Sequence, residues 1–394
     1  MRDKPYCNAP WLGLYYEGTV GIRPCCEWKP DSFPGNYKQY TESEYLKDFK
    51  RNMYNDEPVP GCIECTHNEK IGGHSRRKYY EKFTDVDYEA SGIQYIARMD
   101  FRAGNKCNMM CRMCGPSSSS LLEEEAIESG AQEIGFIKHL DTSDIYDLDL
   151  SNCEEVSILG GEPSIDLKVR KFMDYIADNY PTIKVQVTTN ATNGSDKWFK
   201  TLMKFCVGAG LNIILSVDAA GPTQEFQRKS KISWETIKKN LEKYREVFEG
   251  HPNCQISIQL TCTAINLVTI DKWWDEVVDL DISLMPNQVW YPEGMAVSCI
   301  PISLKHKSVE FLNNWRKKYK PKSTLTGARV DDVYRAVDTI INILETTKYT
   351  GTKNFIEIQN RYDGDRNENV IDLDKRFELM IYGFPVFTNL TDSR

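Results

Sequence analysis

The chain has 394 residues, of which 41% are hydrophobic, so it can bury a large core and form about two or three domain-sized units. Its formal net charge of −8 argues against nonspecific binding of nucleic acid, because contacts with phosphates need a surplus of Lys and Arg. The first residues lack the apolar stretch of a signal peptide, and no apolar run approaches the ~18 residues that span a bilayer. We therefore expect a cytoplasmic protein without a membrane partner.

The 13 cysteines are an odd number, so they cannot all pair into disulfides, and a reducing compartment favours metal binding. Segment 1–89 is rich in Pro, Gly, Cys and aromatic residues, which suits a small domain stapled by metal. Two groups of cysteines stand out: Cys7, Cys25, Cys26, Cys62 and Cys65 in this segment, and Cys107, Cys111 and Cys114 beyond it. We expect the isolated cysteines to be core residues.

From about residue 90, short β-rich runs alternate with amphipathic helical stretches, the pattern of βα units around a parallel sheet. The predicted strands are 95–102, 155–159, 184–189, 212–217, 255–261 and 287–291. We assign residues 90–296 to this domain and residues 297–394 to a C-terminal extension that is mostly helical.

These strands carry polar side chains at every second position. Arg98, Asp100 and Arg102 alternate with apolar residues, and Gln259 and Thr261 belong to a similar alternation. Because side chains alternate between the faces of a strand, one face packs on helices and the other lines a polar space. The sequence therefore predicts an α/β fold, a partial (β/α)6 TIM-like barrel with a ligand-filled lumen. An antiparallel sheet with one face in water fits poorly with the intervening helices.

The strongest chemical signal is a CxxxCxxC, Cys107, Cys111 and Cys114, placed directly after the first predicted strand. Three thiolates on a short loop can hold three irons of a four-iron cluster and leave one iron open for a substrate. A structural zinc site is the alternative, but it closes with four ligands, and the nearest His is His139.

On this motif the sequence resembles the radical S-adenosylmethionine (radical SAM) superfamily from about residue 93 to residue 292. The resemblance implies that a [4Fe-4S] cluster binds S-adenosylmethionine through its amino and carboxylate groups. One electron then breaks a carbon–sulfur bond and gives a 5'-deoxyadenosyl radical that abstracts hydrogen. Met113, between the last two cysteines, is more often aromatic in the family and is implied to lie near the adenine.

A second match, at the end of the second predicted strand, is Gly160, Gly161, Glu162 and Pro163. Glycines let the backbone approach a ligand closely, and a carboxylate can bind an ammonium group. In the family this GGEP motif recognises the amino group of S-adenosylmethionine. By itself it could equally be a tight turn.

Polar residues end the next two predicted strands: Thr189 and Asn190, then Ser216 and Asp218, with Arg228 a short way on. They resemble the family's contacts to the ribose and carboxylate of S-adenosylmethionine. Taken singly, each could be a helix cap or a turn residue.

The first segment resembles a SPASM or twitch domain, which holds an auxiliary iron-sulfur cluster. The resemblance favours Cys7, Cys26, Cys62 and Cys65 as ligands, with Cys25 as the substitute, so that four of the five bind. A zinc knuckle with the same ligands is the alternative. In the family this domain follows the barrel, whereas here it precedes it, which leaves its role open.

These features predict a radical SAM enzyme that abstracts hydrogen from a substrate in the polar lumen, with a peptide or protein as the leading substrate class. Modification of a sugar, nucleotide or other small metabolite is the second possibility, and a scaffold with two structural metal sites is the third. A reductase or a flavodoxin or ferredoxin is the expected electron donor. No catalytic residue beyond the cluster ligands can be assigned.

Overall fold

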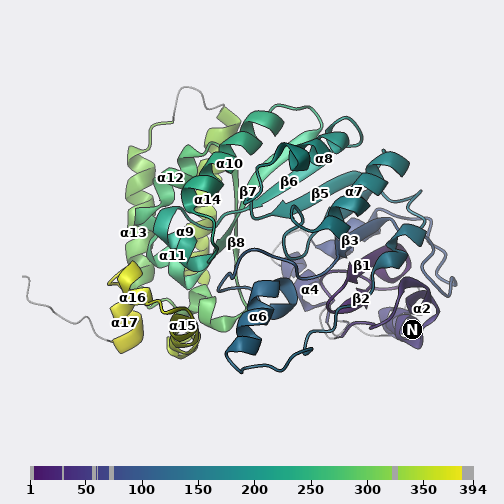
Figure 1. The fold of residues 1–394 in the computed structure, drawn as a ribbon, viewed down its shortest axis with the longest axis horizontal. Coiled ribbons are helices and arrows are strands. Elements are labelled where there is room, and N and C mark those ends of the chain that lie inside the picture. Colours follow the sequence, from purple (N-terminus) through teal and green to yellow (C-terminus); the bar gives the residue numbers. More distant parts are fainter. Residues whose placement is uncertain are drawn as a thin grey trace, which may run out of the picture.

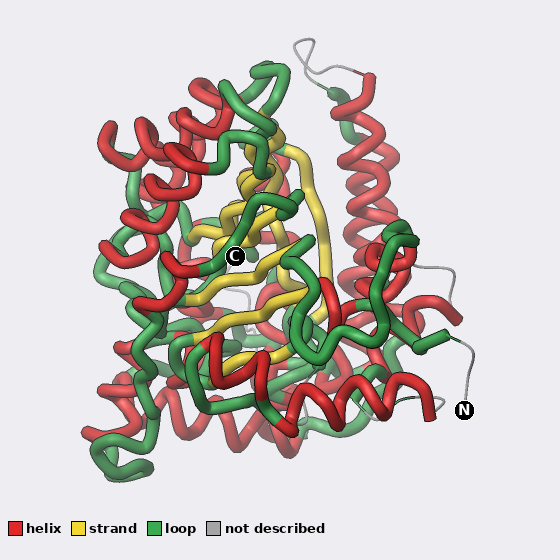
Figure 2. Tube along the Cα trace, turned by 90° about the vertical axis from the view of Figure 1, so that its right-hand side faces the viewer, coloured by secondary structure: helices red, strands yellow, loops and turns green. Residues whose placement is uncertain are grey.

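The computed structural model of the chain describes residues 4–28, 31–55, 59, 61–70, 75–321 and 327–383. Within these residues one eight-stranded sheet runs through the molecule, with helices packed along its outer side (Figures 1 and 2). The sheet order is β2-β1-β3-β4-β5-β6-β7-β8. Every neighbouring pair is parallel except β1 with β2, so the sheet is a partial TIM-like barrel.

The strands are β1 (Gly13–Glu17), β2 (Gly21–Arg23), β3 (Arg98–Arg102), β4 (Glu155–Ile158), β5 (Lys184–Thr189), β6 (Leu211–Ser216), β7 (Cys254–Cys262) and β8 (Ser283–Gln288). The six strands expected from the sequence correspond to β3 through β8; β5 has the predicted bounds, and the other strands differ from the prediction at one or both ends. The largest shift is in β8, which begins at Ser283 and not near residue 287.

Strands β1 and β2 lie in the first segment and were not predicted from the sequence. β1 is a run of only five residues with one charged side chain, Glu17, so its sequence carried a weaker alternation than the predicted strands. It pairs in parallel with β3, and Tyr15 lies opposite Asp100 and Glu17 opposite Arg102. The expected boundary near residue 90 therefore runs through one continuous sheet, and the first segment is not set apart from the barrel by its strands.

The helices before β8 are α1 (Ala9–Leu12), α2 (Tyr37–Glu42), α3 (Glu44–Asn55), α4 (Ile63–Lys70), α5 (Arg76–Glu81), α6 (Ser120–Glu128), α7 (Leu167–Asn179), α8 (Asp196–Cys206), α9 (Gly221–Gln227), α10 (Trp234–Phe248), α11 (Ala264–Val268) and α12 (Trp274–Asp279). The amphipathic pattern explains their packing: α10 buries Trp234, Ile237, Leu241 and Tyr244, spaced by three or four residues along one face.

The C-terminal extension is helical throughout its described part: α13 (Ile302–Lys318), α14 (Gly327–Thr346), α15 (Lys353–Arg366), α16 (Val370–Leu373) and α17 (Phe377–Tyr382). Helix α14 packs along β8, and α15 lies beside the turn Glu293–Met295 that follows that strand (Figure 1). None of the described helices combines the length and the apolarity that a membrane crossing needs.

The inner face of the sheet is polar, as predicted. Asp100, Ser157, Gln186 and Asn212 lie side by side on β3 to β6. Arg98 donates to Ser157 at 2.7 Å, and Asn212 donates to Gln186 at 3.2 Å. The outer face carries fully buried apolar residues that pack on the helices.

Candidate active site

The three cysteines of the CxxxCxxC lie on the loop that follows β3, which we call the cysteine loop (residues 103–119). Its main chain is fastened to the segment after α9: Met110 N–H donates to the Lys229 carbonyl at 2.7 Å, and Arg112 N–H donates to the Gln227 carbonyl at 2.9 Å. Met109 and Ser230 form an isolated antiparallel bridge at the same place. The loop is thereby held at the carboxyl ends of the strands.

All three cysteines line one cavity of about 320 Å3, which is within the size of small-molecule sites, roughly 300–1,000 Å3. Eleven sequence-predicted site residues line it: Cys107, Cys111, Met113, Cys114, Gly160, Gly161, Glu162, Thr189, Asn190, Ser216 and Arg228. Two predicted residues, Pro163 and Asp218, are buried beside it and are not part of its lining. Residues far apart in the sequence thus share one site.

The GGEP turn packs directly against the cysteine loop. A Cβ placed on Gly161 would lie 2.2 Å from the Lys106 carbonyl oxygen, a distance that only glycine avoids. The N–H of Glu162 donates to this carbonyl at 2.8 Å. Gly160 has a φ of +127°, a conformation that is strained for other residues. The glycines are therefore required for the approach of the turn to the cysteine loop.

Glu162 is 1% exposed, and its carboxylate is fixed by neighbouring groups. Its oxygens accept hydrogen bonds from the Thr189 hydroxyl at 2.6 Å, the Asn190 N–H at 2.7 Å and the Ser164 N–H at 3.0 Å. Burial raises the pKa of Glu162, and these donors oppose the shift. The site thus presents one oriented carboxylate at the ends of β4 and β5.

Asp218 acts on the cavity through Arg228. Its carboxylate accepts from Arg228 Nε at 2.5 Å and Nη2 at 3.1 Å, and it is fully buried. Arg228 Nη1 lies 3.9 Å from Cys111 Sγ. Burial alone would lower the pKa of Arg228, but Asp218 and Cys111 raise it, so a permanent positive charge stands beside the thiol. Asp218 therefore fixes the orientation of Arg228, and its expected contact with a cofactor stays a prediction.

Some lining residues were not assigned to the site from the sequence, among them Arg102, Ser118, Gln259 and Thr261. Arg102, Gln259 and Thr261 belong to the polar faces that the alternation marked, so the period-two pattern was a signal for them. Ser118 follows the cysteines in the loop, where nothing in the sequence separates a lining residue from a turn residue.

The model of the radical SAM superfamily matches residues 102–264, a range that contains the three cysteines, the GGEP turn and Arg228. The chain carries a radical SAM domain. The superfamily is one of enzymes, and it implies a [4Fe-4S] cluster and S-adenosylmethionine as cofactors.

Solved structures with a similar arrangement include native anSMEcpe with bound AdoMet, at 16% identity and a TM-score of 0.37 over 56% of this chain and 60% of that one. Streptococcus suis SuiB bound to precursor peptide SuiA matches at 14% identity and a TM-score of 0.35, over 57% of this chain and 47% of that one. The chain thus spans three fifths or less of the length of these structures. Among curated proteins, none matches the chain.

The three thiols of Cys107, Cys111 and Cys114 fit an iron-sulfur cluster better than a zinc ion. All three thiols are free, and burial followed by the neighbouring Cys111 raises the pKa of Cys107 to about 12. In the described part of the chain no three Cys, His, Asp or Glu side chains already converge as metal ligands, so the shared cavity carries the argument. His139, the zinc hypothesis's nearest His, pairs with Glu123 at 3.2 Å and does not line the cavity.

Burial and neighbouring charged groups raise the pKa values of the first-segment cysteines, and their expected role as cluster ligands stays a prediction. Burial raises the pKa of Cys7 to about 12, with Cys62 and Cys65 adding to the shift. Burial and then Cys26, Cys7 and Cys62 raise the pKa of Cys25. Burial and then Asp100 raise the pKa of Cys26 to about 12, and Arg76 opposes the shift.

Proposed function

We propose that this chain is a radical SAM enzyme whose Cys107, Cys111 and Cys114 hold a [4Fe-4S] cluster and whose cavity binds S-adenosylmethionine. The observation that carries the proposal is that the three thiols, the GGEP turn and the polar strand ends line one cavity. When bound and reduced, the cluster supplies the electron that breaks a carbon–sulfur bond of S-adenosylmethionine and so provides the 5'-deoxyadenosyl radical for hydrogen abstraction.

In this proposal the residues of the chain bind and orient S-adenosylmethionine. Glu162 receives its ammonium group, because this buried carboxylate is already fixed by three donors. Asn190 and Ser216, which line the same cavity, would contact the ribose. Met113 supplies an apolar contact for the adenine, and Arg228 offsets the negative charge of the thiolates.

We further propose an auxiliary iron-sulfur cluster in the first segment. Its ligands would be four of Cys7, Cys25, Cys26, Cys62 and Cys65, which are all free thiols. Four thiolates would ligate such a cluster completely.

A peptide or protein is the substrate class that we propose. The resemblance of the first segment to auxiliary-cluster domains supports this choice, because many enzymes with such domains modify peptides. The cavity is also lined by Arg102, Gln259 and Thr261, whose side chains can hydrogen-bond a polar backbone. The electron would come from a reductase or from a flavodoxin or ferredoxin.

The proposal is tested by reconstituting the protein with iron and sulfide under anaerobic conditions, adding dithionite and S-adenosylmethionine, and measuring 5'-deoxyadenosine by mass spectrometry. Wild type should form it, and Cys111→Ala should form at least ~100-fold less, because one of three cluster ligands is gone. Cys153→Ala is the matched control, since Cys153 is also buried but does not line the cavity.

Cys153→Ala should retain wild-type activity. If wild type with a full complement of iron forms no 5'-deoxyadenosine, or if Cys111→Ala is as active as wild type, the proposed function is wrong and the scaffold with structural metal sites takes its place.

A further inference from the structure

Arg112 lies inside the CxxxCxxC, between Cys111 and Met113, yet its side chain points away from the cavity. It is fully buried and is absent from the cavity lining. Nη1 donates to Gln359 at 2.7 Å, and Nη2 donates to Asp363 at 2.8 Å and to Glu368 at 2.7 Å. These partners come from α15 and the turn after it, more than two hundred residues further along the chain.

The guanidinium is also enclosed by aromatic rings. Its carbon lies 3.9 Å from the centre of the Phe226 ring and 5.6 Å from that of Tyr362, and Nε donates to the Phe226 carbonyl at 3.4 Å. A buried arginine is stable only when its donors are met, and here a carboxamide, two carboxylates and a carbonyl meet them. Arginine is required because lysine cannot reach several partners in one plane.

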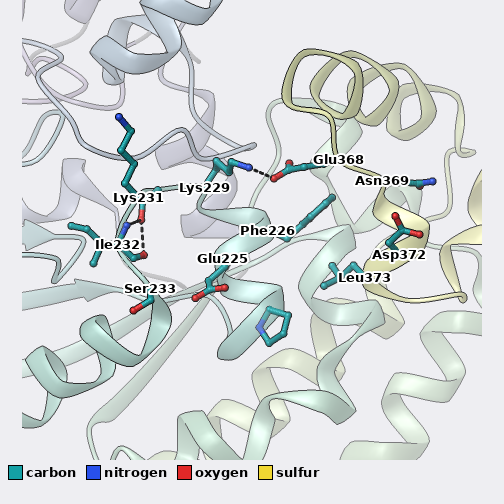
Figure 3. A pocket seen from close by; sticks show the side chains of 12 residues that line it. Glu225, Phe226, Lys229, Lys231, Ile232, Ser233, Glu368, Asn369, Asp372 and Leu373 are labelled. Atoms are coloured by element: carbon teal, nitrogen blue, oxygen red, sulfur yellow. Dashed lines mark hydrogen bonds and ion pairs between the residues drawn. The ribbon is translucent and has the colours of Figure 1, made fainter.

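Glu368, one of the partners of Arg112, also contacts Lys229, whose side chain is partly exposed. Figure 3 shows this contact, and the carbonyl of Lys229 accepts the N–H of Met110 in the cysteine loop. Glu368 therefore bridges the Arg112 side chain and the segment that holds the loop's main chain. A second link joins α15 to α6, the helix after the loop, through Arg366 and Glu125 at 2.7 Å. The extension thus contacts the cysteine loop and the helix that follows it.

We propose that Arg112 is a positioning residue through which the C-terminal extension holds the cysteine loop in the geometry needed for the cluster. The residue adjoins Cys111 in sequence, and its own N–H is bonded to the Gln227 carbonyl, so displacement of its side chain moves the backbone that carries Cys111 and Cys114. The inference rests on the proposed cluster site and assigns the extension a role in the active site.

The first test uses the apoprotein and hydrogen–deuterium exchange, so it is independent of cluster loading and of activity. Arg112→Lys and Glu368→Gln should each raise the exchange rate of the amides of Met110, Arg112 and Cys114 at least ~10-fold, because these amides are bonded only while the loop is held. Arg376→Gln is the matched control: it breaks the extension's pairing with Asp271 and leaves the cysteine loop untouched.

Unchanged exchange in both loop variants, or an equal rise in Arg376→Gln, would overturn the inference. Because the apoprotein alone is measured, that result leaves the proposed function standing, whereas absence of 5'-deoxyadenosine from wild type would remove the proposed function itself.

The second test uses the reconstituted protein. The electron paramagnetic resonance spectrum of the reduced cluster should shift in Arg112→Lys at equal iron content, and 5'-deoxyadenosine formation should fall at least ~10-fold. Arg376→Gln should match wild type in both. A wild-type spectrum and rate in Arg112→Lys would contradict the positioning role.

Discussion

At the scale of single residues, side chains that do not line the cavity hold residues that do. Asp218 and Arg112 are fully buried, and each acts through a neighbour: Asp218 fixes Arg228, and Arg112 fixes the cysteine loop. Gly161 acts by having no side chain, since the Lys106 carbonyl occupies the place of its Cβ. Sequence motifs therefore mark residues that shape the cavity as well as residues that line it.

Gly161→Ala should destabilise the protein by about 2–4 kcal/mol, because an added methyl would force the GGEP turn and the cysteine loop apart. Urea unfolding of the apoprotein measures the change. Gly115→Ala is the control, since Gly115 has an extended φ of −127° with no atom within 4 Å of an added Cβ. Equal stability of the two variants would show that the close approach costs nothing.

At the scale of elements, ion pairs connect the C-terminal helices to the barrel. Asp374, which follows α16, accepts from Lys272 and Arg376 at 2.7 Å each. Arg376 also reaches Asp271 at 2.7 Å, so the link joins α17 to the turn before α12. The alternating pattern that identified the strands gave no sign of this docking, because it connects charged residues about a hundred positions apart.

Replacing Asp374 with Asn should lower the free energy of unfolding by about 1–3 kcal/mol at neutral pH, since the buried carboxylate that pairs with Lys272 and Arg376 loses its charge. Burial alone would raise the pKa of Asp374, but hydrogen bonds from Arg376 and Lys272 hold it far below its usual value. The folded state therefore binds fewer protons, and the stabilisation is present above about pH 4 and lost as the pH falls.

Urea unfolding of wild type and Asp374→Asn at about pH 7 and about pH 3 measures this dependence, and the difference between them should shrink at the lower pH. Asp372→Asn, an exposed change in α16, should be neutral at both. A difference that stays constant with pH would contradict the assignment to the Asp374 carboxylate.

At the scale of the whole molecule, the cysteine-rich first segment and the barrel share one sheet. Leu14 of β1 is 1% exposed and belongs to the same apolar core as Met99 of β3 and Trp198 of α8. A second, smaller core containing Trp11 and Tyr80 lies within the first segment. The continuous core indicates that the first segment and the barrel unfold together.

Leu14→Ala should lower the free energy of unfolding by about 2–5 kcal/mol, because the lost packing belongs to the common core. The full chain should still show one calorimetric transition, shifted to lower temperature. Val20 lies in the turn between β1 and β2 and is 39% exposed, so Val20→Ala should leave the temperature of the calorimetric transition unchanged. A separate low-temperature transition in Leu14→Ala, with the main one unmoved, would show that the first segment unfolds on its own.

The sequence by itself determined the barrel class, six of its strands and most of the cavity lining, because these follow from local properties: period-two alternation, cysteine spacing and a glycine turn at a strand end. Tertiary structure decided the rest. The polar face of β1 is buried, and the pairing of Glu17 with Arg102 and the neighbours that each thiol of the first segment meets exist only in the folded chain. Likewise, the hydrogen bonds from Arg112 to Gln359 and Asp363 of α15 form only in the folded chain, where burial leaves the guanidinium no water to bind.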